Sequence, residues 1–478
     1  MRVLILSAKT GGGHMRAAQA LEAVIKERDR ESVVKIVDGL EYVNHYFNKM
    51  VVDGYKFSAM KLPRVYGVLY RASNTDNNVY KLVQKTNSHY AKKFIPLLAE
   101  FKPDVIVSTH PFMSIMGSAL REKGVTNIPL ISIITDFASH TSYVNAGVSE
   151  YIVSSVQMVD ELEKLGVDRN IIHPVGIPIQ PIFFEKDEQK AEHLSELGFD
   201  PNLKTVLIMA GSFGVTDILK IYENINEIEL DFQIIVITGK NEKLFDAFNS
   251  ILSCNESLRV GDPQPNFDYE KEPSRKEEKL NITKKTKLIY FTDEVHKYMH
   301  ISDLIITKPG GLTVTESLAS CLPMALFKGI PGQETDNTEY LCNNNLAISI
   351  KKNTSAEIIY QLLKYPDRLI SMQESCARLN NPDSAYKVVE ITENAVKNMT
   401  EPVKLPSPED ANLIDETDEE EFYDQINRVM NDYEFDSGNL DENDEDFEDK
   451  LHRLKDKLYE NLKKIADFSL RKDKEEED

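Results

Sequence analysis

A glycine-rich turn near the start of the chain ends in a histidine. In the stretch ILSAKTGGGHMRAAQALEAV, which begins at Ile5, an apolar run leads into Gly11, Gly12 and Gly13 and then His14. Glycine permits positive φ and lets another molecule approach the backbone without meeting a Cβ. The stretch therefore predicts a strand-to-helix turn that is built for contact. It contains neither a GxGxxG pattern nor a Walker GK[ST], so it does not predict nucleotide binding at this loop.

The histidine at the end of this turn is our first candidate for chemistry. An unperturbed histidine has a pKa of about 6.5, and the dipole at a helix N-terminus favours its neutral form, which can accept a proton. We therefore expect His14 to act as a general base. The plainer alternative is an ordinary first-turn residue of a tight turn.

A second glycine-containing stretch, TKPGGLTVTESLASCLPMALFKGIPGQETDN, covers residues 307–337. A strand is expected to end at Lys308, and Gly310 and Gly311 then leave the backbone bare. We expect Thr313 to begin a helix whose unpaired N–H groups can receive a diphosphate. The stretch thus predicts an anion site at the end of a strand.

Polar side chains follow in the same stretch. Glu316 falls on the first turn of the expected helix, where its carboxylate can accept hydrogen bonds from a ribose diol or merely complement the helix dipole. Gln333, Glu334 and Asn337 crowd a Pro-Gly loop at the next strand end, a good arrangement for sugar hydroxyls. Each of them alone is equally a surface polar residue.

Further polar groups end strands earlier in the chain. THPF contains His110, which is either a structural or a functional histidine, and TDFASH contains Asp136 and His140. No His, Cys, Asp or Glu cluster with metal-ligand spacing emerges. We therefore expect no metal site.

The elements that must position these residues alternate between strand and helix. Short apolar runs rich in β-branched residues are typical of buried parallel strands. The first series reads VLILS from Val3, VVKIVD from Val33, DVIVSTH from Asp104, LISIITD from Leu130 and YIVSS from Tyr151. The second reads TVLIMAG from Thr205, FQIIVITG from Phe232, KLIYF from Lys287, DLIITKPGG from Asp303, MALF from Met324 and LAISI from Leu346. This predicts an α/β fold with two doubly wound domains facing each other across a cleft, with ligands at the carboxyl ends of the strands.

The domain boundaries follow from the same pattern. We place an N-terminal domain at residues 1–190 and a C-terminal domain at 191–399, the latter with a polar, aperiodic and mobile insertion at 253–286. An acidic, low-complexity linker is expected over 400–449. A basic amphipathic helix is expected over 450–478, because Leu451, Leu454, Leu458, Leu462 and Ile465 recur at helical spacing.

Net charge and cysteine usage limit the class of protein. Between Pro408 and Asp449, 19 Asp and Glu residues face one Arg, so this stretch carries −18 of the net charge of −22 and the body is almost neutral. Four cysteines lie far apart with no CxxC spacing, which indicates a reducing compartment. No apolar run is long enough for a membrane span, and no signal-peptide pattern is present. We expect a cytoplasmic protein that binds no nucleic acid.

Six motifs occur in the order GGGHMRAAQAL, TDFASH, VGIPIQPIF, AGSFG, ITKPGGLTVTESLA and IPGQETDN. Through them, residues 1–399 resemble the monogalactosyldiacylglycerol synthase and processive diacylglycerol glucosyltransferase family. The resemblance implies the GT-B fold, which consists of two Rossmann-like domains. It also implies an acceptor bound by the N-terminal half, a UDP-sugar bound by the C-terminal half, and transfer with inversion.

The resemblance also implies site residues. For the donor it implies diphosphate at Gly310, Gly311 and Thr313, ribose at Glu316, hexose at Gln333, Glu334 and Asn337, a phosphate loop with Gly211 and Ser212, and uracil at Phe291, Thr292 and Val295. For the acceptor it implies Gly12, Gly13, Asp136 and His140. Asp136 is the second choice for the base, or a partner that orients the acceptor. Tyr143 stands where relatives commonly have tryptophan.

These expectations combine into one function. We expect an inverting hexosyltransferase that moves glucose or galactose from UDP-glucose or UDP-galactose to diacylglycerol, and that is peripheral on the inner face of an anionic cell membrane. The helix dipole and Lys308 can stabilise the leaving UDP, so no cofactor or metal is expected. The alternatives are a lipid-linked or soluble glycan acceptor, or a non-catalytic sensor of UDP-sugar.

Overall fold

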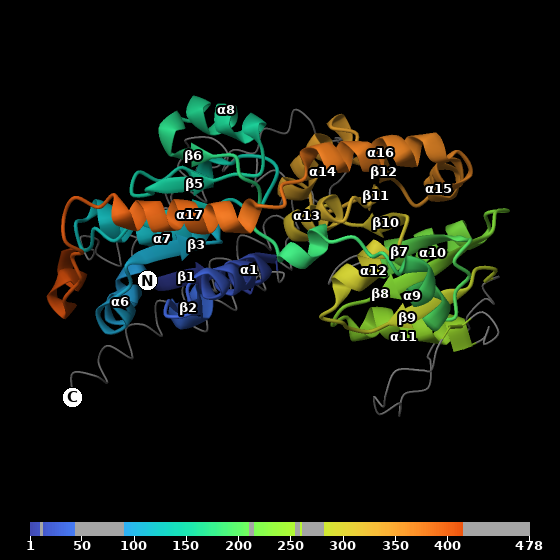
Figure 1. Ribbon diagram of the computed structural model, residues 1–478, viewed down its shortest axis with the longest axis horizontal. Helices are drawn as coiled ribbons and strands as arrows, with labels where there is room; N and C mark the ends of the chain where they lie inside the picture. Colours follow the sequence, from blue (N-terminus) through green and yellow to red (C-terminus); the bar gives the residue numbers. More distant parts are fainter. Residues whose placement is uncertain (10–12, 44–89, 210–214, 254–258, 261–281, 414–478) are drawn as a thin grey trace, which may run out of the picture.

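The computed structural model describes residues 1–9, 13–43, 90–209, 215–253, 259–260 and 282–413. Most of the insertion expected at 253–286, the acidic linker beyond residue 413 and the basic helix lie outside these residues. Gly12, Gly211 and Ser212 lie outside them too. The described chain forms two α/β lobes (Figure 1).

The first lobe contains a parallel sheet of six strands in the order β2-β1-β3-β4-β5-β6. Its elements are β1 (Arg2–Ser7), α1 (Gly13–Arg28), β2 (Val33–Asp38), α2 (Gly39–Val43), α6 (Ile95–Phe101), β3 (Val105–Ser108), α7 (Pro111–Glu122), β4 (Leu130–Ile133), β5 (Glu150–Ile152), α8 (Val156–Lys164) and β6 (Ile172–His173). The strand order reverses between β1 and β3, the position where open α/β sheets bind ligands. This confirms the first predicted series of strands.

The second lobe also contains a parallel six-stranded sheet, in the order β12-β11-β10-β7-β8-β9. Its elements are α9 (Lys190–Glu196), β7 (Lys204–Met209), α10 (Val215–Asn226), β8 (Phe232–Ile237), α11 (Glu242–Ser253), β9 (Thr286–Ile289), α12 (Val295–His300), β10 (Leu304–Thr307), α13 (Gly311–Ala319), β11 (Met324–Phe327), α14 (Gln333–Asn343), β12 (Ala347–Ile350), α15 (Ser355–Lys364) and α16 (Pro366–Leu379). Its order reverses between β7 and β10, so the second predicted series is confirmed as well.

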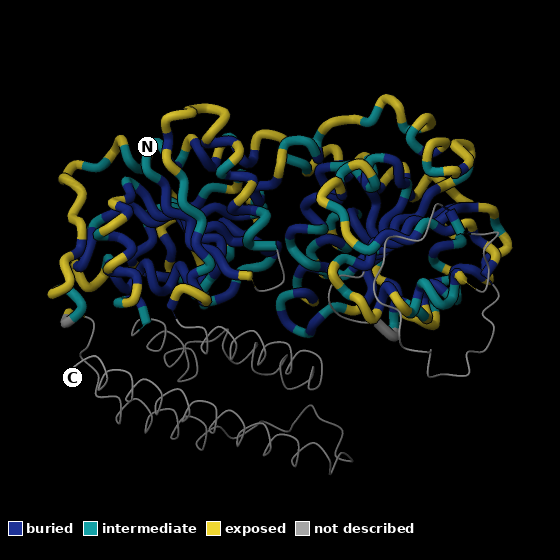
Figure 2. Tube along the Cα trace, turned by 90° about the horizontal axis from the view of Figure 1, so that it is seen from below, coloured by how far each residue is buried: buried dark blue, intermediate teal, exposed yellow. Residues whose placement is uncertain are grey.

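Both sheets are covered on two faces, as their apolar strands require. In β1, Val3 and Ile5 face α1, whereas Leu4 and Leu6 face the side covered by α6 and α7. Figure 2 shows the buried strands at the centre of each lobe, with exposed segments around them. The alternation of side chains along each strand places the two cores on opposite sides of the sheet.

The last described α-helix, α17 (Ser384–Lys397), lies on the first lobe and not on the second. Ala385, Val388 and Val389 are buried with α1 on the face of the first sheet opposite α6 and α7, and Figure 1 shows α17 lying over β3. The assignment of these residues to the C-terminal domain is therefore wrong. Within the described residues the chain crosses between the lobes twice: Ile177 and Phe183 already pack in the core of the second lobe, and α17 returns to the first.

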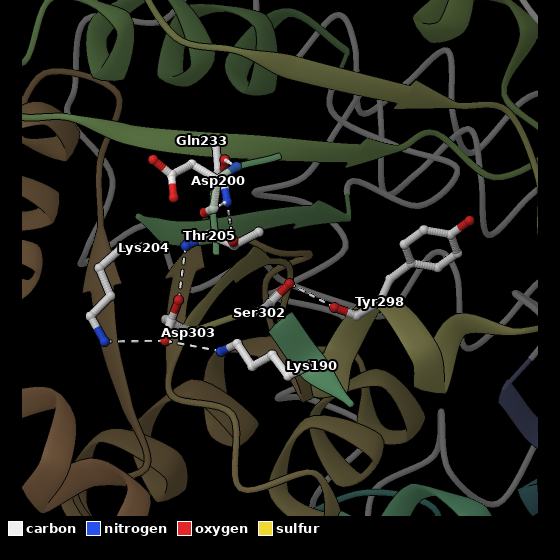
Figure 3. Close-up of polar contacts among 8 residues, drawn as sticks. All are labelled: Lys190, Asp200, Lys204, Thr205, Gln233, Tyr298, Ser302 and Asp303. Carbon is white, nitrogen blue, oxygen red and sulfur yellow. Dashed lines mark hydrogen bonds and ion pairs between the residues drawn. The ribbon is translucent and has the colours of Figure 1, made fainter. Parts of the chain in front are cut away.

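The amino ends of the second sheet are tied together by Asp303, just before β10. Its Oδ1 lies 3.2 Å from the Nζ atoms of Lys190 and of Lys204, and its Oδ2 accepts the N–H of Thr205 at 2.8 Å (Figure 3). The side chain of Gln233 also donates to Thr205 Oγ1. This cluster lies at the edge of the sheet opposite the carboxyl ends, so we interpret it as structural.

Candidate active site

His14 is the second residue of α1, at the carboxyl end of β1, and its ring faces β3. Its Nδ1 lies 2.6 Å from the main-chain oxygen of Thr109 and 3.1 Å from Oγ1 of Thr135. A carbonyl oxygen only accepts hydrogen bonds, so Nδ1 carries the proton and Nε2 keeps its lone pair. Burial lowers the pKa of His14, against the opposing effects of Asp136 and the Thr109 carbonyl. The ring is therefore neutral, in the tautomer that a base requires.

His110 lies beside this ring, with the two ring centroids 4.7 Å apart in an edge-on arrangement. Its Nδ1 accepts the N–H of Phe112 at 3.3 Å and caps α7, which requires its own proton to be on Nε2. Burial, with a smaller contribution from His14, lowers the pKa of His110 well below its usual value. Of the two readings of His110, the structure supports the structural one.

Asp136 follows β4 and is buried at 3% exposure. Its Oδ2 accepts hydrogen bonds from the Tyr143 hydroxyl at 2.9 Å and from the Gln333 amide, and its Oδ1 accepts one from Asn337 at 3.2 Å. Burial raises the pKa of Asp136, and these donors oppose that shift. The three donors satisfy a carboxylate, which can only accept, so we assign the ionised form. The group in contact with His14 Nδ1 is the Thr109 carbonyl rather than this carboxylate.

His140 lies four residues after Asp136 and caps a short turn. Its Nδ1 lies 3.1 Å from the N–H and 2.8 Å from the hydroxyl of Ser142, so it caps the 3-10 turn Thr141–Tyr143. This turn carries the Tyr143 hydroxyl that bonds Asp136. A direct contact of His140 with an acceptor stays a prediction.

The donor-side helix α13 begins at Gly311, two residues before the expected start, with Gly310 as its N-cap. Thr313 is partly exposed in its first turn. A Cβ on Gly311 would lie 1.8 Å from the main-chain oxygen of Thr135 in the first lobe. Glycine at this position lets the two lobes touch at the helix N-terminus.

Glu316 therefore lies in the second turn of α13, not the first, and the alternative of a first-turn dipole partner is excluded. Its carboxylate is 2% exposed, and Nη1 of Arg16 on α1 lies 3.3 Å from both of its oxygens. Burial raises the pKa of Glu316, and Arg16 opposes the shift. Arg16 lies within the motif GGGHMRAAQAL, but its pairing with Glu316, 300 residues away, is not indicated by the sequence.

Gln333, Glu334 and Asn337 lie in the first turns of α14 rather than in a loop. Gly332 precedes the helix with φ 98°, a conformation that favours glycine. Glu334 forms a 2.8 Å ion pair with Lys308, and its second oxygen accepts the N–H of Ile330 at 2.7 Å. This pair ties the Pro-Gly loop to the end of β10.

Asn337 is fully buried and its amide bonds both lobes. Oδ1 accepts the N–H of Phe137 at 2.8 Å, while Nδ2 donates to Asp136 and to the main-chain oxygen of Pro309 at 3.1 Å. The amide hydrogens are thus engaged by the protein itself. A contact of Asn337 with the hexose stays a prediction.

The loop after β9 presents an aromatic ring. Phe291 is 39% exposed, and Nζ of Lys240 lies 4.7 Å from its ring centroid. The Thr292 hydroxyl accepts the N–H of Glu294 at 3.0 Å, and the buried Val295 begins α12. Such a ring can stack on a nucleobase, as the uracil assignment requires.

The structure thus brings Gly13, Asp136, Gly311, Glu316, Gln333 and Asn337 to the contact between the lobes, with His14 beside Thr135 in the first lobe and Gly310 beside Glu334 in the second. It adds Arg16, Thr109, Thr135 and Tyr143, which the sequence did not single out as site residues. Within the described ranges, no group of three His, Cys, Asp or Glu residues is arranged to hold a metal ion. In the same ranges, every helix is too short or too polar to span a bilayer.

Two doubly wound parallel sheets, with a histidine at the switch point of one and a glycine-started helix at that of the other, form the GT-B fold. Residues 14–179 match the family model described as monogalactosyldiacylglycerol (MGDG) synthase. Residues 205–394 match that of the glycosyltransferase family 28 C-terminal domain. The chain belongs to the family of monogalactosyldiacylglycerol synthases and processive diacylglycerol glucosyltransferases, which confirms the resemblance.

Curated relatives are similar along most of their length. A processive diacylglycerol beta-glucosyltransferase of Bacillus pumilus (strain SAFR-032) is 26% identical over 399 residues, covering 81% of this chain and 94% of that protein. One of Staphylococcus epidermidis (strain ATCC 12228 / FDA PCI 1200) is 26% identical over 375 residues, covering 77% and 86%.

Solved structures agree on the fold. The S. aureus MnaA-UDP co-structure is 13% identical with a TM-score of 0.50, covering 84% of this chain and 98% of that one. A putative UDP-N-acetylglucosamine 2-epimerase from Listeria monocytogenes is 13% identical with a TM-score of 0.51, with the same coverage. At this identity the likeness is one of fold alone.

Proposed function

We propose that the chain transfers a hexose, glucose or galactose, from a UDP-sugar to the hydroxyl of diacylglycerol with inversion at the anomeric carbon. The names of the similar proteins and the two family models support the reaction class. The single observation that carries the mechanism is the 2.6 Å contact between His14 Nδ1 and the Thr109 carbonyl, which leaves Nε2 of a neutral ring available as a base.

In the proposed reaction, Nε2 of His14 takes the proton of the acceptor hydroxyl while the hydroxyl oxygen attacks the anomeric carbon. The bond from that carbon to the diphosphate oxygen breaks, and UDP leaves with the electron pair on the side opposite the attack. A positioned base contributes about 10²–10⁴-fold to such a step. The Thr109 carbonyl also stabilises the imidazolium that forms, because it accepts the Nδ1 proton throughout.

The leaving UDP carries negative charge that the donor side must stabilise. The free N–H groups at the start of α13 and the Lys308 ammonium, which lies in the same region, offer positive charge for the diphosphate. We propose that this suffices without a metal ion. Transfer that is unchanged by a chelator such as EDTA would support this part, and loss restored by a divalent cation would contradict it.

The remaining assignments follow the family motifs. We propose that Glu316 binds the ribose, Gln333 and Glu334 the hexose, Gly310, Gly311, Thr313, Gly211 and Ser212 the diphosphate, Phe291, Thr292 and Val295 the uracil, and Gly12, Gly13 and His140 the acceptor. The substrate lipid resides in a membrane. We therefore propose that the protein acts as a peripheral protein on the inner, anionic face of the cell membrane.

The test is direct. The full chain is incubated with radiolabelled UDP-glucose or UDP-galactose and diacylglycerol micelles, and label is counted in the chloroform-extractable lipid. We expect labelled glycolipid with one of the donors. No lipid label with either donor would contradict the proposal, and release of UDP only with a glycan acceptor would indicate the other acceptor class.

A further inference from the structure

The side chain of Asn337 on α14 makes hydrogen bonds with both lobes. It is 0% exposed, and its amide makes hydrogen bonds with the Phe137 N–H, the Asp136 carboxylate and the Pro309 carbonyl. The side-chain amide of asparagine has two hydrogens to donate and one oxygen that accepts through two lone pairs. Both polar atoms of the Asn337 amide thus already have protein partners, and two of the three partners lie in the first lobe.

The segment that Asn337 holds, Thr135–Phe137, is the one that reaches the base. The Thr135 hydroxyl lies 3.1 Å from His14 Nδ1, and the Thr135 carbonyl lies against Gly311 at the start of α13. The Phe137 ring stacks on Tyr340 of α14, with the centroids 5.3 Å apart. One three-residue segment therefore contacts the base, the donor helix and α14 together.

We propose that Asn337 is a positioning residue that fixes Thr135–Phe137 between the lobes and so sets the place of His14 relative to the donor helix. This inference rests on the proposed function, since it gives Asn337 a role in that reaction other than contact with the hexose. The bond from Asn337 to Pro309 ties the same amide to the loop that precedes α13. A shift of the amide would therefore change the distance between base and donor, and a misplacement of about 1 Å can cost about 10²-fold in rate.

The sharpest variant is Asn337→Asp, which keeps the shape of the side chain and its acceptor for the Phe137 N–H. Its second oxygen would replace Nδ2 and face the Asp136 carboxylate and the Pro309 carbonyl, which can only accept. We expect kcat to fall about 10²-fold with little change in KM for the UDP-sugar. A hexose contact would behave differently, because a carboxylate also binds sugar hydroxyls. Asn337→Asp with normal kcat, or with only a raised KM, would overturn the proposal.

Exchanging the two polar groups provides a rescue. In Asp136→Asn/Asn337→Asp, the amide of residue 136 can donate to the new carboxylate, while its oxygen still accepts from Tyr143 and Gln333. We expect the double variant to recover about tenfold in kcat over Asn337→Asp, a coupling of about 1.4 kcal/mol that double-mutant cycles resolve. A double variant no better than Asn337→Asp would overturn the role. Asn343→Asp, at an exposed position of the same helix, is the matched control and is expected to keep normal kcat.

A measurement without turnover separates this inference from the proposed function. The Phe137 N–H is protected by Asn337 Oδ1, so amide hydrogen exchange of a peptide containing Phe137 should be about tenfold faster in Asn337→Ala than in the wild type. Unchanged exchange would overturn the inference even if the wild type is an active glycosyltransferase. If exchange is faster in Asn337→Ala but the wild type transfers no hexose, the role of Asn337 in fixing Thr135–Phe137 stands and the proposed function is refuted.

Discussion

The Nδ1 atom of His14 lies 2.6 Å from the main-chain oxygen of Thr109, so a carbonyl from the end of β3 orients the ring at the start of α1. The contact joins the two strand ends at which the first sheet reverses its order. A main-chain oxygen cannot be protonated in the range where histidine titrates, so the tautomer with the proton on Nδ1 is kept at every pH of interest.

Replacing the base should separate catalysis from binding. His14→Ala is expected to lower kcat by about 10²–10⁴-fold, with UDP-sugar affinity near that of the wild type, because the ring touches Thr109 and Thr135 rather than the donor helix. Steady-state kinetics and calorimetric UDP titration measure the two effects. If His14→Ala turned over normally and Asp136→Asn were dead, Asp136 would be the base.

The second histidine should make stability depend on pH. His110 is held neutral by burial with its pKa well below 6.5, so as pH falls below 6.5 the unfolded chain binds a proton that the native chain does not. The free energy of unfolding then falls by about 1.4 kcal/mol per pH unit for this group, and the full stability is present above 6.5.

His110→Asn keeps an acceptor for the Phe112 N–H, since asparagine is a good N-cap, and removes the titrating ring. Thermal unfolding between pH 7 and about 5.5 should therefore decline less steeply than in the wild type. Identical slopes for the two proteins would show that His110 is protonated in the native state.

The ion pair across the lobes should respond differently to changes at its two ends. Glu316→Ala is expected to raise KM for the UDP-sugar, because a ribose contact is made in both the ground and the transition state. Arg16→Ala leaves a buried carboxylate without its partner and should cost about 1–3 kcal/mol of stability, as measured by denaturant unfolding. A normal KM in Glu316→Ala would mean that the ribose binds elsewhere.

A methyl group at the start of α13 should hold the lobes apart. Gly311→Ala would place a Cβ 1.8 Å from the Thr135 oxygen, so we expect kcat to fall by about 10²-fold and the radius of gyration in solution scattering to rise. Gly310→Ala is the control for the scattering only, because its Cβ meets nothing closer than 3.8 Å. An unchanged radius in Gly311→Ala would contradict the contact.

The charged C-terminal stretch should contribute to membrane binding. The test variant is truncated after Leu413, because Pro402 and Lys404 make hydrogen bonds with Asn127 and Thr126 and therefore belong to the first lobe. Each basic residue near an anionic surface contributes about 1 kcal/mol, which the acidic stretch opposes. We expect the truncated chain to co-sediment less with anionic vesicles than the full chain. Equal co-sedimentation would exclude the role.

The sequence by itself determined the strands and the strand ends at which the candidate site residues lie. Buried parallel strands are continuous apolar runs, and glycines after them mark turns, so both sheets and the loops before His14 and Thr313 could be predicted from local pattern. Helix starts were less certain: α13 begins at Gly311 and α14 takes in Gln333, because Gly310 and Gly332 act as N-caps without a capping side chain.

Only the tertiary structure decided which groups meet. The Thr109 carbonyl contacts His14 from 95 residues away, and Asn337 reaches Asp136 across 201. Every residue has a main-chain oxygen, so the sequence does not show which one contacts His14. The partner of a side-chain amide such as that of Asn337 depends on how the two lobes pack. The position of α17 was decided in the same way. Its apolar stripe could pack on either sheet as far as the sequence pattern shows, and it is buried on the first sheet because the chain returns to the first lobe after α16.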